Sequence, residues 1–172
     1  MPLFRHGLPD AVRRSLDLPA GDSILTSAEL VDGSWAIASR GALTVASADA
    51  GTAGPARTRP WYDVDRAAFD PETTTITIEW VDADTTLLPL ANARRTALAQ
   101  TVRERVQSSV VLAETLTFPG GGKAKVAVRR DAQGGLFSQV VAHPGLDLGD
   151  PSVIERIDLT EARLRSASGL PL

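Results

Sequence analysis

The sequence predicts an α+β protein that is mainly β, and three observations support this prediction. Between Ser23 and Leu90, short apolar runs alternate with turn residues and indicate up to seven strands. A single helical pattern follows over residues 92–109. Residues 110–168 then show three more strands and a last helix. A chain of 172 residues has the length of one domain, or of a small domain with an appendage.

The composition excludes several classes of protein. Apolar residues make up 43% of the chain and charged residues 23%, which is typical of globular proteins and argues against disorder or a coiled coil. No apolar run reaches the ~20 residues of a membrane-spanning helix, and no secretory leader is expected. Cysteine is absent, so disulfides and thiolate chemistry are excluded. Because the net charge is −3, we expect no nucleic-acid partner, while peripheral membrane contact stays open. We expect a cytoplasmic location, with which the absence of cysteine is compatible.

Residues 1–22 form a lead-in segment, with a short helix expected over residues 8–16. The strands expected after it are residues 24–31, 34–39, 42–47, 57–64, 74–81 and 85–90, and residues 65–69 are expected to form a short strand or a turn. Asp32 and Gly33 predict a two-residue type I′ hairpin, because both central positions of that turn need a positive φ. Pro60 confines its strand to a sheet edge or a bulge, because proline cannot donate to a ladder.

The helix expected over residues 92–109 has Asn92 as its candidate N-cap. Leu98, Val102 and Val106 recur every four residues and form one apolar stripe. A single stripe is typical of a helix that covers one apolar surface. We therefore expect this helix to plug the strands before it, and an aspartate at Val102 to be strongly destabilising.

Three stretches carry a resemblance to a known fold. They are LPAGDSIL over residues 18–25, Trp61 before the middle strands, and VRERV over residues 102–106. Over roughly residues 18–110 the chain resembles uncharacterised bacterial proteins with a pleckstrin-homology-like domain. The resemblance implies a bent barrel of two near-orthogonal sheets over residues 23–110, plugged by its C-terminal helix. The first hairpin lacks the clustered Lys/Arg motif of lipid-binding pleckstrin-homology domains, so phosphoinositide binding is not implied.

Residues 111–172 are expected to form a β-meander and a C-terminal helix that dock on the barrel or extend one of its sheets. The three strands are expected at residues 110–118, 123–130 and 136–142, with glycine-rich turns between them. Asp150 is the candidate N-cap of the helix, Pro151 suits its first position and Gly169 suits its end.

The sequence predicts no catalytic constellation, metal site or cofactor. The glycine-rich stretch 120–123 lacks the first glycine and the Ser/Thr of a phosphate loop, so we expect a hairpin tip that binds no nucleoside triphosphate. Three neighbouring aspartates lack the glycine and glutamate of a calcium loop; they are Asp63, Asp65 and Asp70. His143 lies in a loop where a general base can act, although a hydrogen bond within the loop is the simpler interpretation.

The candidate binding residues are aromatic and basic. Trp61 and Tyr62 follow Pro60 on an expected edge strand and are the expected exposed anchors for a partner. The basic candidates are Lys123, Lys125, Arg129 and Arg130. These cations can bind an anion, or they can protect an exposed edge strand or form a solvated face.

Two functions remain open at this stage. The first is a non-catalytic protein-interaction module, a scaffold or adaptor that offers an edge strand to a protein partner or to a second copy of the chain. The second is a small-ligand or anion-binding protein, or a weak enzyme, that uses the His143 loop and basic residues 123–130. A flat apolar patch favours the first function and a deep polar pocket favours the second.

Overall fold

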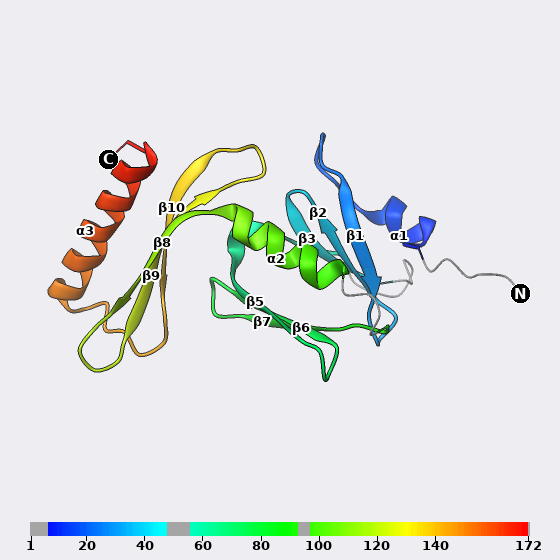
Figure 1. Ribbon diagram of the computed structural model, residues 1–172, viewed down its shortest axis with the longest axis horizontal. Coiled ribbons are helices and arrows are strands. Elements are labelled where there is room, and N and C mark those ends of the chain that lie inside the picture. Colours follow the sequence, from blue (N-terminus) through cyan, green and yellow to red (C-terminus); the bar gives the residue numbers. More distant parts are fainter. Residues whose placement is uncertain (1–6, 48–55, 93–96, 172) are drawn as a thin grey trace, which may run out of the picture.

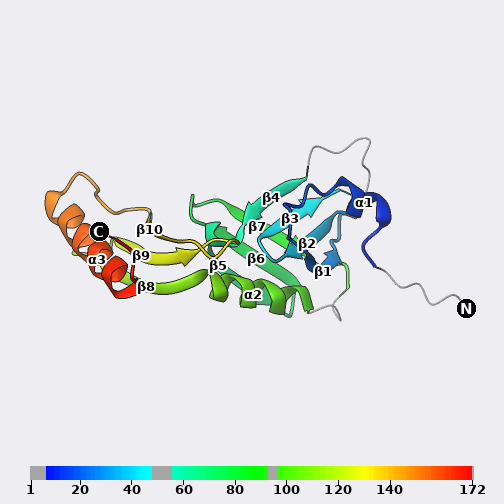
Figure 2. The same ribbon diagram turned by 90° about the horizontal axis from the view of Figure 1, so that it is seen from above.

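The computed structural model describes residues 7–47, 56–92 and 97–171. This part of the chain forms three antiparallel sheets and three α-helices in an elongated arrangement, with α1 and α3 toward opposite ends (Figures 1 and 2). The prediction of an α+β protein that is mainly β is confirmed. Most of the loop expected at residues 48–56, and the first turn of the helix expected from Asn92, lie outside the described residues.

The first sheet contains four strands in the order β1-β2-β3-β4. These strands are β1 (Ile24–Glu29), β2 (Trp35–Ser39), β3 (Ala42–Ala46) and β4 (Arg57–Pro60). Helix α1 (Asp10–Ser15) packs against this sheet. Every residue of β2 is buried, because both faces of the sheet are covered. Trp35 and Ile37 share a cluster with Val12 of α1, whereas Ala36 and Ala38 belong to the main core.

The β1–β2 connection differs from the expected type I′ hairpin. Gly33 has a φ of 81°, but Asp32 does not have a positive φ. The Leu30 N–H donates to the Ser34 carbonyl oxygen, and the Gly33 N–H donates to the Leu30 carbonyl oxygen, so three residues from Val31 form the loop. A type I turn followed by one left-handed residue fits this pattern. The hairpin prediction is correct in position and wrong in turn type.

The second sheet has the order β5-β6-β7. Its strands are β5 (Val64–Asp70), β6 (Thr75–Trp80) and β7 (Thr85–Pro89). The chain reaches β5 from β4 through a 3₁₀ turn, η1 (Trp61–Asp63), so the strand expected over residues 57–64 is broken. β4 ends at Pro60 and is an edge strand, as the proline predicts.

Helix α2 (Ala97–Ser109) packs on both of these sheets. Leu98 and Val102 are buried in the main core, and Val106 is partly buried against it, as the apolar stripe predicts. Trp61 and Trp80 lie in the same cluster. Elements α1 to α2 form one region, which we call the N-terminal region; its main core lies between the two sheets and α2, and a smaller cluster lies under α1.

The two sheets of the N-terminal region do not close into the expected barrel. They meet at an isolated bridge between Leu30 and Leu90, where the Val31 N–H also donates to the Pro89 carbonyl oxygen. Strands β4 and β5 follow each other through η1 but do not pair. Within the described ranges, the barrel expected over residues 23–110 is therefore two separate sheets that share a core.

The C-terminal region consists of a third sheet and one helix. It contains β8 (Val110–Thr117), β9 (Lys123–Arg130), β10 (Leu136–Ala142) and α3 (Pro151–Ser168). The strand order is β10-β9-β8, so the meander forms its own sheet and does not extend either of the others. Helix α3 covers one face, where Ile157 and Leu164 share a cluster with Val126 and Val128 of β9.

The ends of α3 are as predicted. The Asp150 carboxylate accepts a hydrogen bond from the Ser152 N–H, Pro151 is the first helical residue, and Gly169 has a φ of 79° at the C-terminal end.

No helix in the described part of the chain combines the length and apolarity needed to cross a membrane.

Candidate functional site

Trp61 lies in the core and not on the surface. It is 4% exposed, and its indole Nε1 donates a hydrogen bond to the Ser39 carbonyl oxygen at 3.0 Å. Tyr62 is half-buried, and its ring meets the ring of Phe137 edge-on with centroids 5.1 Å apart. The expectation of an exposed Trp61 is wrong, because η1 turns the indole inward. Tyr62 contacts the C-terminal region of its own chain.

The basic residues of β9 do not protect a sheet edge, because β9 is the central strand of its sheet. That interpretation is therefore wrong. Lys125 donates from Nζ to the Asp65 carboxylate at 2.9 Å and to the Asp65 carbonyl oxygen at 3.1 Å. Arg129, on the same face of β9, is completely buried. Both cations join the C-terminal region to the start of β5.

Arg129 is held by three acceptors from three elements. Its Nε donates to Gln139 Oε1 at 3.1 Å, its Nη1 to Ser109 Oγ at 3.1 Å, and its Nη2 to the Val64 carbonyl oxygen at 3.0 Å. Burial lowers the pKa of Arg129, and the charge of Asp65 opposes this shift. A guanidinium keeps its proton in proteins, so this is a buried cation with hydrogen-bond partners. We call these contacts the junction.

The remaining basic candidates are separated from the junction and from each other. Lys123 is exposed at the start of β9, beside a hairpin tip with a strand on either side, as expected for residues 120–123. Arg130 is exposed at the other end of β9. The four cations that are close in sequence therefore do not form one site.

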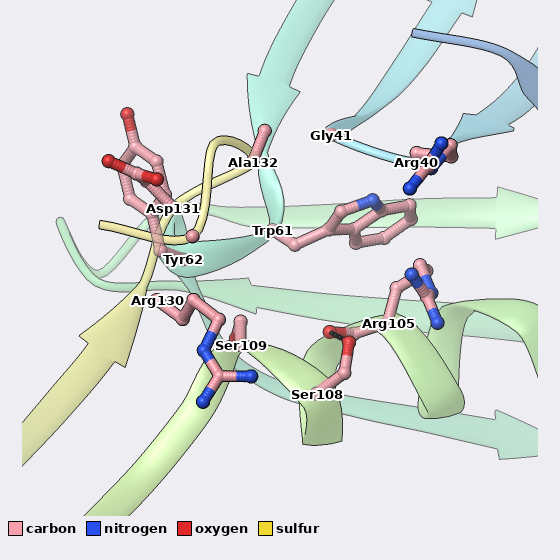
Figure 3. Close-up of a pocket in the computed structure, with 11 residues that line it drawn as sticks. Arg40, Gly41, Trp61, Tyr62, Arg105, Ser108, Ser109, Arg130, Asp131 and Ala132 are labelled. Carbon is pink, nitrogen blue, oxygen red and sulfur yellow. Dashed lines mark hydrogen bonds between the residues drawn. The ribbon is translucent and has the colours of Figure 1, made fainter. Parts of the chain in front are cut away.

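A polar pocket of about 220 Å³ lies between the two regions (Figure 3). Three arginines from three elements line it: Arg40 from the β2–β3 turn, Arg105 from α2 and Arg130 from the end of β9. Figure 3 shows Arg40 and Arg105 on either side of the Trp61 indole, and Arg130 near Ser109. We call this the arginine pocket.

One wall of the arginine pocket is a close approach between two turns. A Cβ at Gly41 would lie 3.1 Å from the Ala132 Cβ and 3.2 Å from Asp22 Oδ2, so glycine permits this contact. Asp131, the one carboxylate in the described lining, faces its own turn and accepts from the backbone N–H groups of Gln133 and Gly135. The three guanidinium groups thus have no acidic partner there.

A second hollow, of about 570 Å³, runs between α2 and β5, which is an edge strand of the second sheet. Its apolar lining includes Ala67, Phe69 and Ile76 from the sheet and Ala99 and Val106 from the helix. We call it the β5 groove. An edge strand offers unpaired backbone N–H and carbonyl groups beside this apolar lining.

Two features limit the accessible part of the β5 edge. Lys125 and Arg129 donate to the carbonyl oxygens of Asp65 and Val64, so the free part of the edge begins at Arg66. Arg66 and Arg103 also line the groove, and neither forms an ion pair with the described residues. The rim of the β5 groove therefore carries positive charge.

The other predicted features do not come together as a site. Asp65 pairs with Lys125, and burial raises the pKa of Asp63, although Arg59 at 3.8 Å lowers it. No group of three acidic or histidine side chains capable of holding a metal occurs in the described ranges. Two carboxylates, Asp147 and Asp150, are close to His143 in the sequence. Asp147 accepts from the Gly149 N–H and Asp150 accepts from the Ser152 N–H, so neither orients the imidazole.

Sequence reasoning did not find the β5 groove or two of the three pocket arginines. Arg40 and Arg105 are 65 positions apart and have no common motif. For the β5 edge, the sequence indicates only a short strand or turn over residues 65–69, before the strand expected at residues 74–81.

Comparisons of this chain with protein-family models, with curated proteins and with solved structures found no match. Its function is therefore inferred from the geometry of the groove and the pocket.

Proposed function

We propose that the protein is a non-catalytic cytoplasmic interaction module of pleckstrin-homology-like architecture, and that its β5 groove binds an extended segment of a partner protein. The architecture is supported by the order of elements. Seven strands in sheets of four and three are followed by one helix that packs on both sheets. The two sheets meet at the Leu30–Leu90 bridge and stay unpaired between β4 and β5, so the proposed architecture is an open form of that plan.

The observation that carries the proposal is the free edge of β5 next to an apolar groove. A peptide that adds as a strand obtains backbone hydrogen bonds from the edge, and alternate side chains enter the pockets beside it. Residues Arg66 to Asp70 provide this edge, while Ala99 and Val106 of α2 provide the opposite wall. Among the described residues, the groove lining contains no serine, threonine, cysteine or histidine, which supports binding without turnover.

The charges at the rim define the partner. Arg66 and Arg103 line the groove, and Lys125 neutralises Asp65 at its closed end. Complementarity therefore favours a segment in which apolar residues alternate with aspartate or glutamate. A strand from a second copy of the chain is the competing occupant, and the other edge strands of the described sheets that a copy can offer are β1, β4, β7, β8 and β10.

A selection from a random peptide library, displayed on phage and applied to the immobilised full chain, tests this proposal. We expect enriched peptides to combine apolar and acidic residues and to bind in fluorescence polarisation. Ala99→Arg places a long cation inside the groove and should abolish binding. Ala113→Arg makes the same change at an exposed position of the edge strand β8 and should leave binding unchanged.

Two outcomes contradict the proposal. One is the absence of peptides enriched above the bare support. The other is a selected peptide that binds the Ala99→Arg variant as tightly as the parent, with circular dichroism showing both to be folded. A second variant, Arg66→Glu with Arg103→Glu, tests the charge argument, since it should reverse the preference for acidic peptides. Light scattering that shows a dimer, lost in Ala99→Arg, would identify a second copy as the occupant.

A further inference from the structure

We propose that the arginine pocket is a second binding site, independent of the β5 groove, and that it takes a small polyphosphate anion. Its three cationic side chains come from the two regions of the chain: Arg40 and Arg105 from the N-terminal region and Arg130 from the C-terminal region. The site therefore exists only when the two regions are docked.

The unpaired state of these arginines is the first argument. Several arginines in the described part of the chain have partners, such as Arg59 with Asp82 at 3.0 Å and Arg163 with Glu114, whereas Arg66 and Arg103 at the β5 groove form no ion pair there. Arg40, Arg105 and Arg130 have no side-chain hydrogen bond or ion pair with the described residues. Three like charges around one hollow are unfavourable alone and complementary to an anion.

In the described part of the chain, no hydrogen bond joins the side chains of the three arginines to the polar groups beside them. The C-terminal end of α2 reaches the pocket, and its free carbonyl groups could hold guanidinium groups. The Ser108 hydroxyl donates to the Arg105 carbonyl oxygen at 2.9 Å, and the Ser109 hydroxyl donates to the Val106 carbonyl oxygen at 2.7 Å. Asp131 is bound within its own turn. The donors of the three arginines are thus available to a ligand.

Size and charge define the ligand class. A volume of about 220 Å³ is below the ~300–1,000 Å³ typical of pockets for drug-sized molecules, so a whole nucleotide is too large. Guanidinium groups match the oxygen pairs of phosphate and form charge-assisted bidentate bonds. Figure 3 places Arg130 apart from Arg40 and Arg105, which requires an anion with more than one charged group. Inorganic triphosphate satisfies these conditions.

Isothermal titration of the full chain with inorganic triphosphate, without metal ions, tests the proposal. We expect saturable binding that weakens at least about tenfold in Arg105→Gln with Arg130→Gln, because each lost charge-assisted bond weakens binding by about tenfold or more. The matched control is Arg66→Gln with Arg103→Gln, which removes the same charge at the β5 groove. Lys123→Ala is a second control, at the glycine-rich hairpin tip.

Further titrations establish the chemistry of the ligand. Citrate carries a similar charge on carboxylates, and orthophosphate has a single phosphate group. Both should bind more weakly than triphosphate. Heat denaturation should show a higher melting temperature with triphosphate, lost in Arg40→Gln, because a ligand that binds only the folded state stabilises it.

Three results would overturn the proposal: no saturable binding, equal weakening in both double variants, or loss of binding in Lys123→Ala. Equal weakening would mean attraction by overall charge only. All of these variants change exposed or half-buried side chains, so folding is expected to be retained and is checked by circular dichroism. Failure here leaves the peptide selection unaffected, since the β5 groove uses other residues.

Discussion

The two regions of this protein use the same strand alternation for different purposes. In β6 of the N-terminal region, Ile76 and Ile78 face the core, while Thr77 on the other face stays partly exposed. In β9 of the C-terminal region, Val126 and Val128 face α3, but Ala127 and Arg129 on the other face are buried as well. Lys125 and Arg129 on that face meet the N-terminal region. A polar strand face therefore identifies a solvent face in one region and a docking face in the other.

The difference follows from how each region covers its sheets. The N-terminal region encloses its main core with two sheets and α2. The C-terminal region has one sheet and one helix, so one sheet face is left to be covered by another part of the chain. That face carries Lys125 and Arg129, and their partners lie on β5, α2 and β10. The two regions thus dock through hydrogen bonds and an ion pair beside the ring contact of Tyr62 with Phe137, whereas each region is held by apolar packing.

Val102→Asp should have the largest effect on stability, because it places an unpaired charge in the main core, where Val102 is 1% exposed. We expect the free energy of unfolding to fall by about 3–5 kcal/mol, measured by urea denaturation. Gln107→Asp is the control, at an exposed position of the same helix, and should change stability by less than about 0.5 kcal/mol. A Val102→Asp variant as stable as the control would remove α2 from the core.

Arg129→Met should have the next largest effect, because it leaves three acceptors at the junction without their donor. We expect a loss of about 2–3 kcal/mol, since each buried unsatisfied group costs ~1–3 kcal/mol and the methionine side chain recovers part of this by packing. Arg130→Met, at the exposed neighbouring position, should be nearly neutral. Equal stability of the two variants would show that the junction contributes nothing to docking.

Gly41→Ala should have a smaller effect and tests the second contact between the regions. The added Cβ would lie 3.1 Å from the Ala132 Cβ, and Asp22 on the other side is held by hydrogen bonds to Ser39 and Arg40. We expect a loss of about 1 kcal/mol from crowding. Ala132→Gly in the same chain should recover part of this loss, and additive effects in the double-mutant cycle would mean that the turns do not touch.

Asp150→Asn should have the smallest effect and one that depends on pH. Hydrogen bonds from the Ser152 side chain and backbone lower the pKa of Asp150 from its ordinary value of 3.8. The carboxylate therefore stabilises the fold above pH 3.8, and this contribution is lost as the pH falls through the lowered pKa of the folded state. Asparagine also caps helices, so the difference in melting temperature from the parent should be small at pH 7 and should shrink further near pH 2.

Asp32→Asn makes the matching change in the N-terminal region, where hydrogen bonds from Ser34 lower the pKa of Asp32. If the junction makes the two regions unfold together, both variants shift one common transition. Two transitions, each responding to one variant, would show that the regions unfold separately.

Local features of this fold follow from the sequence because their causes lie within a few residues. The caps of α3 at Asp150 and Gly169 depend on hydrogen bonds and backbone angles at those positions. The bounds of β9 and β10 follow from alternation between glycine-rich turns. The edge position of β4 follows from Pro60, which cannot donate a ladder hydrogen bond. The apolar stripe of α2 likewise needs only helical periodicity.

Tertiary structure alone decides the surroundings of the site residues, because those surroundings come from segments far apart in the sequence. Trp61 is a core residue because η1 turns between two sheets, which the residues around it do not specify. Arg129 and Arg130 are neighbours in sequence, yet one meets Val64 and Ser109 and the other lines a pocket with Arg40 and Arg105. Alternation determines that they face opposite sides of a strand. Only the packing of the two regions determines what lies on each side.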